Sequence, residues 1–595
     1  MPHEAPRDPW SPRPVDRATV VAEGAELDGA KILGAPADPA DWPRWREQLA
    51  AWRTDARARI GHTGALYERA EFAWTQRCFS VALVWLWDEQ LYDFEQRRFT
   101  PERLLAEAAE FGGFDGVVLW HAYPVIGIDD RNQFDWYRDV PGIRELVAEL
   151  REHDVRVFVD YNPWDVGTRR EPVDDARAVA DVVAWLAADG VFLDTMKEAP
   201  QELRAALDEV RPGVAFEGES TLPLARVEDH HLSWAQWFDD SDVPGVIRSR
   251  WFEQRHMLHH TRRWNRDHSD ELHSSFLNGV GMLIWDVVFG VWVGWNARDR
   301  GLLRTLVEVQ RRNARLLTHG EWTPLAARSE HLDVVGSRWR DGDRELWALV
   351  NRRAEPFAGP VDLDGRQLEL GLPGRAVLAI EPNGDVTVSP RGLSPEFPER
   401  ETVRIEPPIV RVAEVPPGMV EGPPPAASIA VFRRRETGTY GEAPYVEEWK
   451  PLPPRLHDLV DVERPAPRGR YAIGVREVVG PEGSPLTGLT LDEAREHARS
   501  AGGRLPTEDE WQAAAVAGLL GRAEPLVWNW TESEHRDGRT RFAILKGGSH
   551  VEVTGSDWYA DGGALPPEHS LKLLLAGGGL QRSPAIGFRL AVDLP

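Results

Sequence analysis

Short apolar runs alternate with amphipathic stretches of helical period between about Phe79 and Leu325. The runs are rich in β-branched and aromatic residues, and this strand–helix alternation is typical of a parallel sheet with crossover helices. Because eight such runs follow one another, we expect a closed (β/α)8 barrel, or TIM barrel, rather than an open sheet. The expected strands span residues 79–87, 116–123, 155–162, 190–195, 213–219, 232–238, 256–264 and 281–286.

The pattern changes after the predicted barrel. Short alternating strands with Gly, Pro and Asp between them predict an antiparallel β-domain, and the stretch that follows is dense in proline. A chain of 595 residues also exceeds the ~250–300 residues of a single core. The predicted fold class is therefore multidomain α/β, with an N-terminal extension (1–78), a barrel (79–330), a β-domain (331–390), a Pro-rich linker or irregular region (391–468) and a C-terminal domain (469–595).

Charge and hydropathy exclude several classes of partner. The formal net charge of −26 would repel phosphate backbones, so we expect no nucleic acid. No apolar run approaches the ~18–20 residues that span a bilayer, so we expect no membrane partner. The start of the chain lacks the basic and apolar regions of a secretory signal, which leads us to expect a cytoplasmic protein.

Cysteine and tryptophan usage narrow the chemistry. Cys78 is the single cysteine, which excludes an intrachain disulfide and any site that needs two thiolates. The 26 tryptophans are many, and flat aromatic faces are surfaces on which sugar rings stack. The same residues could equally fill a large core, and the sequence leaves both explanations open.

Acidic residues close several of the predicted strands. In a barrel the active site lies at the carboxyl ends of the strands, where Asp194 and Glu219 would end two neighbouring ones. A retaining glycosidase needs two carboxyl groups about 5–5.5 Å apart, and neighbouring strand ends can supply this spacing. Such acids could instead cap helices or bind arginines. The full set of strand-end acids is Asp160, Asp194, Glu217, Glu219 and Asp286.

Three of these strands resemble motifs of the α-amylase-type and melibiase-type α-glycosidases. Residues 155–163 (VRVFVDYNP) resemble the motif of the third strand, residues 190–194 (GVFLD) the nucleophile motif, and Gly218-Glu219 the acid/base motif. The resemblance implies a catalytic barrel with Asp194 as nucleophile and Glu219 as acid/base, with Glu217 as the alternative. Phe192 stands where the α-amylase motif has an arginine, so a related but separate α-glycosidase-like family fits better.

Aromatic and polar side chains surround these acids at other predicted strand ends. Together they offer stacking faces and hydrogen-bonding groups suited to a polyol, although each alone could be a core residue. The predicted substrate-binding residues are Trp85, Trp87, Trp120, His121, Tyr123, Asp160, Asn162, Trp164 and Asp286, and Tyr161 lies among them.

A histidine cluster raises the alternative of a metal site. His256, His259 and His260 are close in sequence, but successive residues of a strand point to opposite faces, so the three could not all converge. We therefore predict no metal site and no cofactor.

The C-terminal region resembles the formylglycine-generating-enzyme family, also called the sulfatase-modifying factor family. The resemblance rests on four blocks in order: residues 502–515 (GGRLPTEDEWQAAA), 527–531 (VWNWT), 546–549 (KGGS) and 586–589 (IGFR). It implies a C-type-lectin-like α+β fold. The family's oxidase holds copper with two cysteines that are absent here, and the iron motif of the related sulfoxide synthases is broken because Arg262 stands at its glutamate position.

The sequence thus predicts a glycosidase, an O-glycosyl hydrolase, with a noncatalytic accessory domain. The reaction would be retaining hydrolysis or transglycosylation of an α-linked oligosaccharide or glycoside, with a carbohydrate substrate as the partner. The accessory domain could shape the cleft, bind sugar or form a homo-oligomer. Two alternatives stay open, namely a non-haem metal oxidoreductase that uses the C-terminal fold and a noncatalytic carbohydrate-binding protein.

Overall fold

The computed structural model describes most of the 595 residues. The described residues are 13–15, 27–121, 128–164, 169–219, 222–236, 243–262, 266–288, 291–292, 294–398, 401–436, 447–449, 458–467, 469–552 and 562–595. Tyr123 lies outside them. Among the helices they form, none combines the length and the apolar character needed to cross a membrane.

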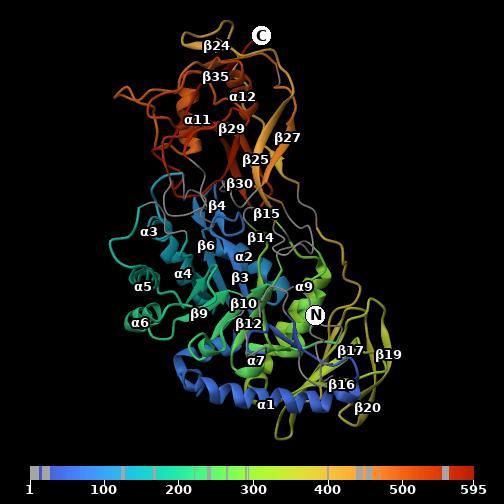
Figure 1. The fold of residues 1–595 in the computed structure, drawn as a ribbon. Helices are drawn as coiled ribbons and strands as arrows, with labels where there is room; N and C mark the ends of the chain where they lie inside the picture. The colour runs from blue at the N-terminus through green and yellow to red at the C-terminus, as the bar shows by residue number, and fades with distance from the viewer. Residues whose placement is uncertain are drawn as a thin grey trace, which may run out of the picture.

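A closed parallel barrel forms the centre of the chain (Figure 1). Its hydrogen-bonded order is β10-β12-β13-β3-β6-β7-β8-β9, and each strand lies within one of the eight predicted runs, which confirms the barrel. The strands are β3 (Ser80–Trp85), β6 (Gly116–Trp120), β7 (Arg156–Tyr161), β8 (Gly190–Leu193), β9 (Ala215–Glu219), β10 (Leu232–Gln236), β12 (Met257–Thr261) and β13 (Gly281–Ile284).

Amphipathic helices cover the outside of the barrel. In α4, Ile143, Leu146, Val147 and Leu150 are buried at the spacing of one helix face, which is the reason this segment packs as a helix against the sheet. Asp174 and Asn296 cap α5 and α9 by accepting from backbone N–H groups. The barrel helices are α2 (Pro101–Ala108), α3 (Asp135–Arg138), α4 (Ile143–Glu152), α5 (Asp175–Leu186), α6 (Gln201–Val210), α7 (Arg248–Phe252), α8 (Ser269–Asn278), α9 (Ala297–Arg312) and α10 (Ala314–His319).

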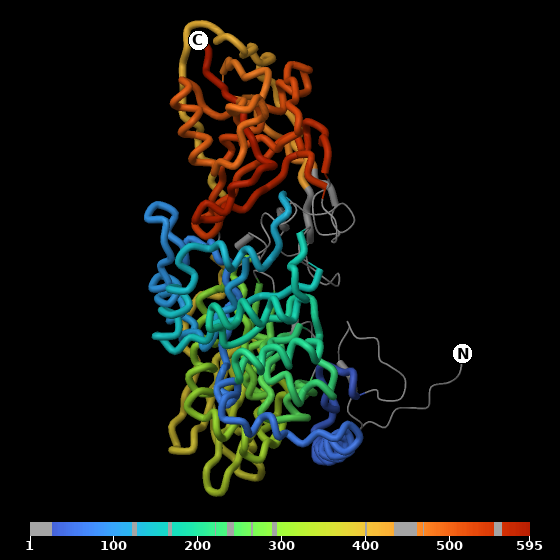
Figure 2. Tube along the Cα trace, turned by 90° about the vertical axis from the view of Figure 1, so that its left-hand side faces the viewer, coloured from blue at the N-terminus to red at the C-terminus, as the bar shows by residue number. Residues whose placement is uncertain are grey.

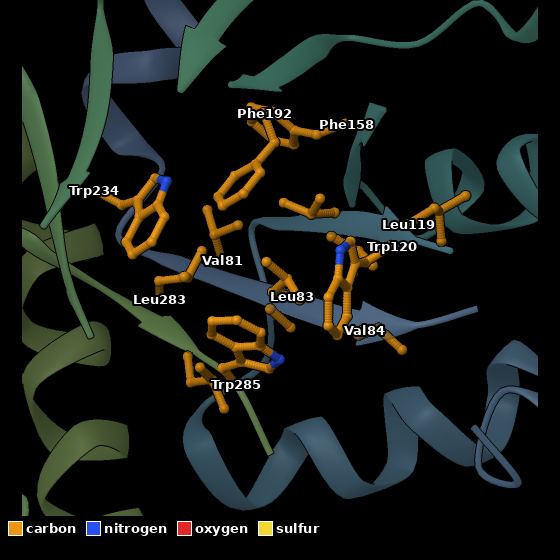
Figure 3. Close-up of a cluster of buried hydrophobic side chains, with 14 of the residues drawn as sticks. Val81, Leu83, Val84, Leu119, Trp120, Phe158, Phe192, Trp234, Leu283 and Trp285 are labelled. Atoms are coloured by element: carbon orange, nitrogen blue, oxygen red, sulfur yellow. The ribbon is translucent and has the colours of Figure 1, made fainter. Parts of the chain in front are cut away.

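Aromatic rings fill the interior of the barrel (Figure 3). Phe192 stacks on Trp234 with ring centroids 5.3 Å apart, and Trp120 meets Trp285 edge-on at 5.2 Å. Phe158 occupies space that glycines leave free, because a Cβ placed on Gly190 would lie 2.2 Å from its ring. The position where α-amylases carry an arginine is thus part of an apolar core here.

The N-terminal extension and the β-domain complete the lower part of the molecule in Figure 1. Helix α1 (Trp42–Ile60) crosses the amino-terminal end of the barrel, and strand β2 (Ile32–Gly34) pairs with β11 (Val246–Ile247). The β-domain is a seven-stranded antiparallel sheet that begins at Glu321, before the predicted boundary at 331. Its strands are β16 (Glu321–Arg328), β17 (Val334–Asp341), β18 (Arg344–Asn351), β19 (Phe357–Leu363), β20 (Arg366–Leu372), β21 (Val377–Ile380) and β22 (Val386–Val388).

The proline-rich region contributes strands and is not an irregular linker throughout. Three of its strands contain only two or three residues, too few to show an alternation in the sequence, whereas the other two contain nine and seven residues. Strand β23 pairs with β29, and β24 with β28, both of which belong to the C-terminal domain. The strands are β23 (Val403–Arg404), β24 (Met419–Glu421), β25 (Ser428–Glu436), β26 (Glu447–Trp449) and β27 (Asp458–Arg464).

The C-terminal domain packs two helices against strands that are mostly antiparallel, with one parallel pair. Both helices, α11 (Leu491–Ser500) and α12 (Glu508–Val516), begin with a capping box, formed by Thr490 with Glu493 and by Thr507 with Glu510. Trp528 and Trp530 are buried core residues. The strands are β28 (Tyr471–Gly474), β29 (Trp528–Arg536), β30 (Arg541–Lys546), β31 (Gly548–Ser549), β32 (Gly563–Ala564), β33 (Ser570–Leu574), β34 (Ile586–Phe588) and β35 (Ala591–Asp593).

Three of the four sequence blocks of this domain meet in one buried network. Arg589 donates to Asn529 over 2.7 Å and to Glu477 over 2.6 Å, and Trp511 donates to the same Asn529 oxygen over 2.9 Å. Because these groups are buried, their mutual hydrogen bonds are needed for folding. The blocks therefore maintain the fold of the domain.

The contact between Gly190 and Phe158 yields a prediction on stability. We expect Gly190→Ala to destabilise the protein by about 1–3 kcal/mol, because the added methyl group must displace a packed ring. Gly371→Ala is the matched control, since a Cβ there has open space. Thermal unfolding of both variants tests this, and equal transition temperatures would contradict the described packing.

Candidate active site at the carboxyl end of the barrel

Asp194 and Glu219 lie beside each other at the barrel rim. Asp194 directly follows β8, and its N–H donates to the Tyr161 carbonyl over 3.0 Å. Glu219 ends the neighbouring strand β9, and its carboxylate accepts the N–H of Thr195 over 2.6 Å. Both acids are partly buried. The residue after Asp194 is thus bonded to the Glu219 carboxylate, which brings the two predicted catalytic acids together.

Thr195, which makes this connection, has an unfavourable backbone conformation. Its φ is 62°, which a β-branched residue rarely adopts because the side chain crowds the backbone. Such conformations persist only where surrounding contacts enforce them, and they gather at functional sites. Here the enforcing contacts are the N–H bond to Glu219 and a 3.4 Å hydrogen bond from the Thr195 hydroxyl to Asn162.

Asn162 fixes the carboxylate of Asp194. Its Nδ2 donates to Asp194 Oδ2 over 3.1 Å. The backbone of Asn162 is bonded twice to the side chain of Gln133, at 3.0 Å through the N–H and 2.7 Å through the carbonyl. Gln133 was not among the predicted residues, because it lies in a loop without any motif. Only the fold shows that it orients Asn162.

Glu217 lies below the rim, inside the barrel. It is fully buried, and its Oε1 lies 2.7 Å from His259 Nδ1, while His259 Nε2 donates to the Cys78 carbonyl over 2.7 Å. Since a carbonyl can only accept, Nε2 carries a proton, and a second proton on Nδ1 makes the ring a cation beside the carboxylate. Burial is the largest influence and lowers the pKa of His259, but the charge of Glu217, its hydrogen bond and the Cys78 carbonyl together outweigh burial, so the net pKa is raised. Glu217 is therefore engaged in an internal ion pair.

The three clustered histidines point to different partners. His256 bonds to Ser233 at 2.8 Å and to Tyr67 at 3.1 Å, His259 bonds to Glu217, and His260 lies 3.4 Å from the Ser274 hydroxyl. They do not converge, as the alternation of strand residues predicts. Over the described ranges no group of three His, Cys, Asp or Glu side chains could hold a metal ion.

The other predicted substrate-binding residues separate into exposed and buried ones. Trp164 is 58% exposed, and its backbone N–H donates to Asn162 over 2.9 Å. Asp160 and His121 are buried with side-chain atoms 3.9 Å apart. Trp85, Trp87 and Trp120 are buried in the core, where Trp87 packs against Tyr92 and Phe99. The Trp87 ring is fully buried in this structure.

Asp286 meets a residue of the C-terminal domain. Arg539 comes from the turn between β29 and β30, where Asp537-Gly538 forms the hairpin signal. Its buried guanidinium donates to Asp88 over 2.8 Å and to Glu107 over 2.7 Å and lies 3.9 Å from Asp286. Burial raises the pKa of Asp88 to about 6 and raises that of Asp286, and Arg539 opposes both shifts. The sequence analysis did not single out Asp88, Glu107 or Arg539. Arg539 is 451 residues from Asp88 and 432 residues from Glu107, and no local sequence pattern connects residues that far apart.

The C-terminal domain lies above the barrel in Figures 1 and 2, and two further contacts join it to the rim. Arg131, which follows β6, donates to the carbonyls of Leu580 and Arg582 over 2.6 and 3.1 Å. Tyr92 packs so closely under Gly577 that a Cβ there would lie 2.2 Å from its ring, and its hydroxyl accepts from the Gly578 N–H over 3.2 Å. The C-terminal domain is therefore seated over the ends of β13, β3 and β6.

A comparison with protein families agrees with the resemblance of the C-terminal region. Residues 447–525 match the family described as "Sulfatase-modifying factor enzyme 1-like domain". No curated protein sequence matches the chain. Similar solved structures include α-amylase-type glycoside hydrolases, at identities that indicate similarity of fold alone.

Three of these structures illustrate the range of sequence identity, TM-score and coverage. The acarbose-soaked debranching enzyme of Nostoc punctiforme is 11% identical with a TM-score of 0.37, over 51% of this chain and 98% of its own. The noncanonic maltogenic α-amylase AmyB of Thermotoga neapolitana is 11% identical with a TM-score of 0.36, over 53% and 98%. An α-amylase of Lactobacillus plantarum is 13% identical with a TM-score of 0.34, over 53% and 99%.

The ion pair of Glu217 and His259 predicts a pH-dependent stability. A histidine whose folded pKa is raised stabilises the fold below its unfolded pKa of about 6.5, and this contribution is lost as the pH rises through the folded value. We therefore expect Glu217→Gln to lower the unfolding temperature more at pH 6 than at pH 9. Glu209→Gln, at an exposed helical position, is the control. A loss that does not change with pH would show that His259 is not charged.

The charge cluster around Arg539 predicts the opposite trend. In Arg539→Met the buried carboxyls lose their cation, so they bind protons more tightly when folded than when unfolded. We expect a loss of about 3 kcal/mol at pH 8 that becomes smaller as the pH falls toward 5. Arg470→Met, which removes an exposed arginine paired with Glu421, serves as control. A larger loss at pH 5 than at pH 8 would refute the cluster's role.

Proposed function

We propose that this chain is a retaining glycoside hydrolase or transglycosidase that acts on α-linked oligosaccharides or glycosides. The observation that carries the proposal is the pairing of Asp194 and Glu219 at the carboxyl ends of adjacent barrel strands, connected through Thr195 and fixed by Asn162. Active sites of (β/α)8 barrels lie at this end, and two carboxyl groups are the chemical equipment of retaining glycosidases.

The proposed reaction assigns one role to each acid. The Asp194 carboxylate forms a bond to the anomeric carbon while the glycosidic C–O bond breaks, and Glu219 gives its proton to the leaving oxygen. Glu219, now a carboxylate, then takes a proton from water, and the water oxygen replaces Asp194 at the anomeric carbon. A sugar hydroxyl in place of water gives transglycosylation. Neither step requires a cofactor.

The surroundings of the pair support this division of roles. Asn162 donates to one Asp194 oxygen, which holds the nucleophile in a fixed orientation. Glu219 accepts the Thr195 N–H on Oε2, which orients its carboxyl group beside Asp194. Glu217 is fully buried beside His259, and we therefore assign acid/base catalysis to Glu219.

A noncatalytic carbohydrate-binding protein is the second candidate. One observation favours it: the Thr195 N–H already donates to one oxygen of the Glu219 carboxylate over 2.6 Å, so that oxygen is engaged within the protein. The two candidates differ in turnover but not in sugar binding. A kinetic experiment therefore distinguishes them.

The proposal predicts the behaviour of three variants toward 4-nitrophenyl α-glycosides. Asp194→Asn removes the nucleophile and is expected to lower kcat by at least about 10³-fold with unchanged folding. Glu219→Ala is expected to lose activity that azide restores, because azide attacks the glycosyl intermediate without needing a base. Asp181→Asn, at an exposed position on α5 where Asp181 pairs with Arg177, is the control.

Two results would overturn the proposal. Turnover by Asp194→Asn at the unaltered rate would exclude this residue as the nucleophile. Sugar binding by the unaltered protein, measured calorimetrically, without hydrolysis of any of a panel of α- and β-glycosides would favour the noncatalytic candidate. Azide rescue of Glu217→Ala in place of Glu219→Ala would exchange the roles of the two glutamates.

A further inference from the structure

A cleft of about 630 Å³ lies where the C-terminal domain meets the barrel. One wall is the hairpin of β4 (Tyr92–Asp93) and β5 (Arg98–Phe99), which follows β3 in the chain (Figure 1). The other wall is helix α11 with the loop around residues 576–582. Ligand sites in proteins have volumes of roughly 300–1,000 Å³ and are frequent at domain interfaces, so this cleft has the size and the place of a binding site.

Close contacts hold the two walls at a fixed separation. The Tyr92 hydroxyl accepts from the Gly578 N–H over 3.2 Å. A Cβ on Gly578 would lie 2.6 Å from Pro141 of the barrel, and its φ of 64° also favours glycine. Because the domains touch so closely beside the cleft, the cleft is preformed and a ligand need not separate its walls.

Charges of both signs line the cleft and balance one another. Three lining arginines are each paired with a lining acid: Arg495 with Asp492, Arg499 with Glu496, and Arg582 with Glu493. An anionic ligand would have to compete with these carboxylates for the arginines. An uncharged ligand with hydroxyl groups can accept from guanidinium N–H groups and donate to carboxylate oxygens while the pairs stay intact.

An aromatic surface lies among these polar groups. Phe94, in the turn of the hairpin, is half-buried and lines the cleft. Its ring is held by the edge of Tyr92, at 5.1 Å between centroids, and by the Arg541 guanidinium, 4.7 Å from the ring centroid. A fixed apolar surface among donors and acceptors suits a sugar, which has C–H faces as well as hydroxyl groups.

We propose that this cleft is a second ligand site, which binds a neutral α-linked oligosaccharide. The preference for an uncharged, polyhydroxylated ligand comes from the paired charges and from Phe94. The choice of an α-linked sugar within that class rests on the proposed function.

The cleft is separate from the acid pair. Its barrel wall follows β3, and in the closed strand order β9, which ends in Glu219, lies directly across the barrel from β3. A sugar in the cleft is therefore bound by the hairpin and the C-terminal domain, away from Asp194 and Glu219. The accessory domain thus contributes half of a binding site and not only a contact with the barrel.

The test compares two tryptophan variants in Asp194→Asn protein, in which we expect no turnover of the sugars. Glu496→Trp places an indole inside the cleft, at a side chain that is 67% exposed. Glu209→Trp, at a 75% exposed helical position outside the cleft, is the matched control. The probes for calorimetry are maltotriose, nigerotriose and isomaltotriose, which are neutral and differ in α-linkage, and inorganic phosphate. We expect at least one trisaccharide to bind, with a Kd about 10-fold or more higher in Glu496→Trp than in Glu209→Trp, because the indole fills the cleft.

Three results would overturn the inference. They are binding of none of the trisaccharides, equal binding by the two variants, and phosphate binding that is weakened in Glu496→Trp, which would identify an anion site. Failure of the proposed function is a different result. Trisaccharide binding that Glu496→Trp weakens, in an unaltered protein that hydrolyses no glycoside, would overturn the proposed catalysis and support the cleft. Hydrolysis of nitrophenyl glycosides with equal trisaccharide binding by the two variants would overturn the cleft alone.

Discussion

Closure of the parallel sheet is the constraint on which the other features depend. Pairing of β13 with β3 completes a ring in which all eight strands run in one direction, so every strand delivers its last residue to the same rim. Asp194 and Glu219 come together for this reason, although 25 positions separate them in the sequence. The ring also encloses an aromatic interior, and it is this packed core that makes the rim rigid enough to hold a strained Thr195.

Polar groups inside and around the barrel are arranged in two levels. Below the rim, Glu217 and His259 form an internal ion pair that joins β9 to β12. At the rim, Asn162 and Thr195 contact the acid pair, and Gln133 supports them from behind. The interior position of Glu217 and its ion pair with His259 separate this acid from the two rim acids to which we assign chemistry.

Buried ion pairs hold the C-terminal domain against the barrel. Arg539 faces Asp88, Glu107 and Asp286, and each of these groups would be costly to bury alone. A contact of this kind gives little net stability but strongly disfavours any arrangement in which one partner is removed. The domain that resembles a sulfatase-modifying factor therefore acts here as part of the barrel's rim.

Local pattern determined much of this protein. The eight strands, the helix faces such as that of α4 and the strand-end position of Asp194 and Glu219 follow from periodicities of two and 3.6 residues, which depend only on near neighbours in the chain. The tertiary structure alone decided that Trp87 and Glu217 are interior, that Gln133 supports Asn162, and that Arg539 reaches Asp88. These contacts join residues far apart in sequence, and no local periodicity records which distant side chain will fill a given space.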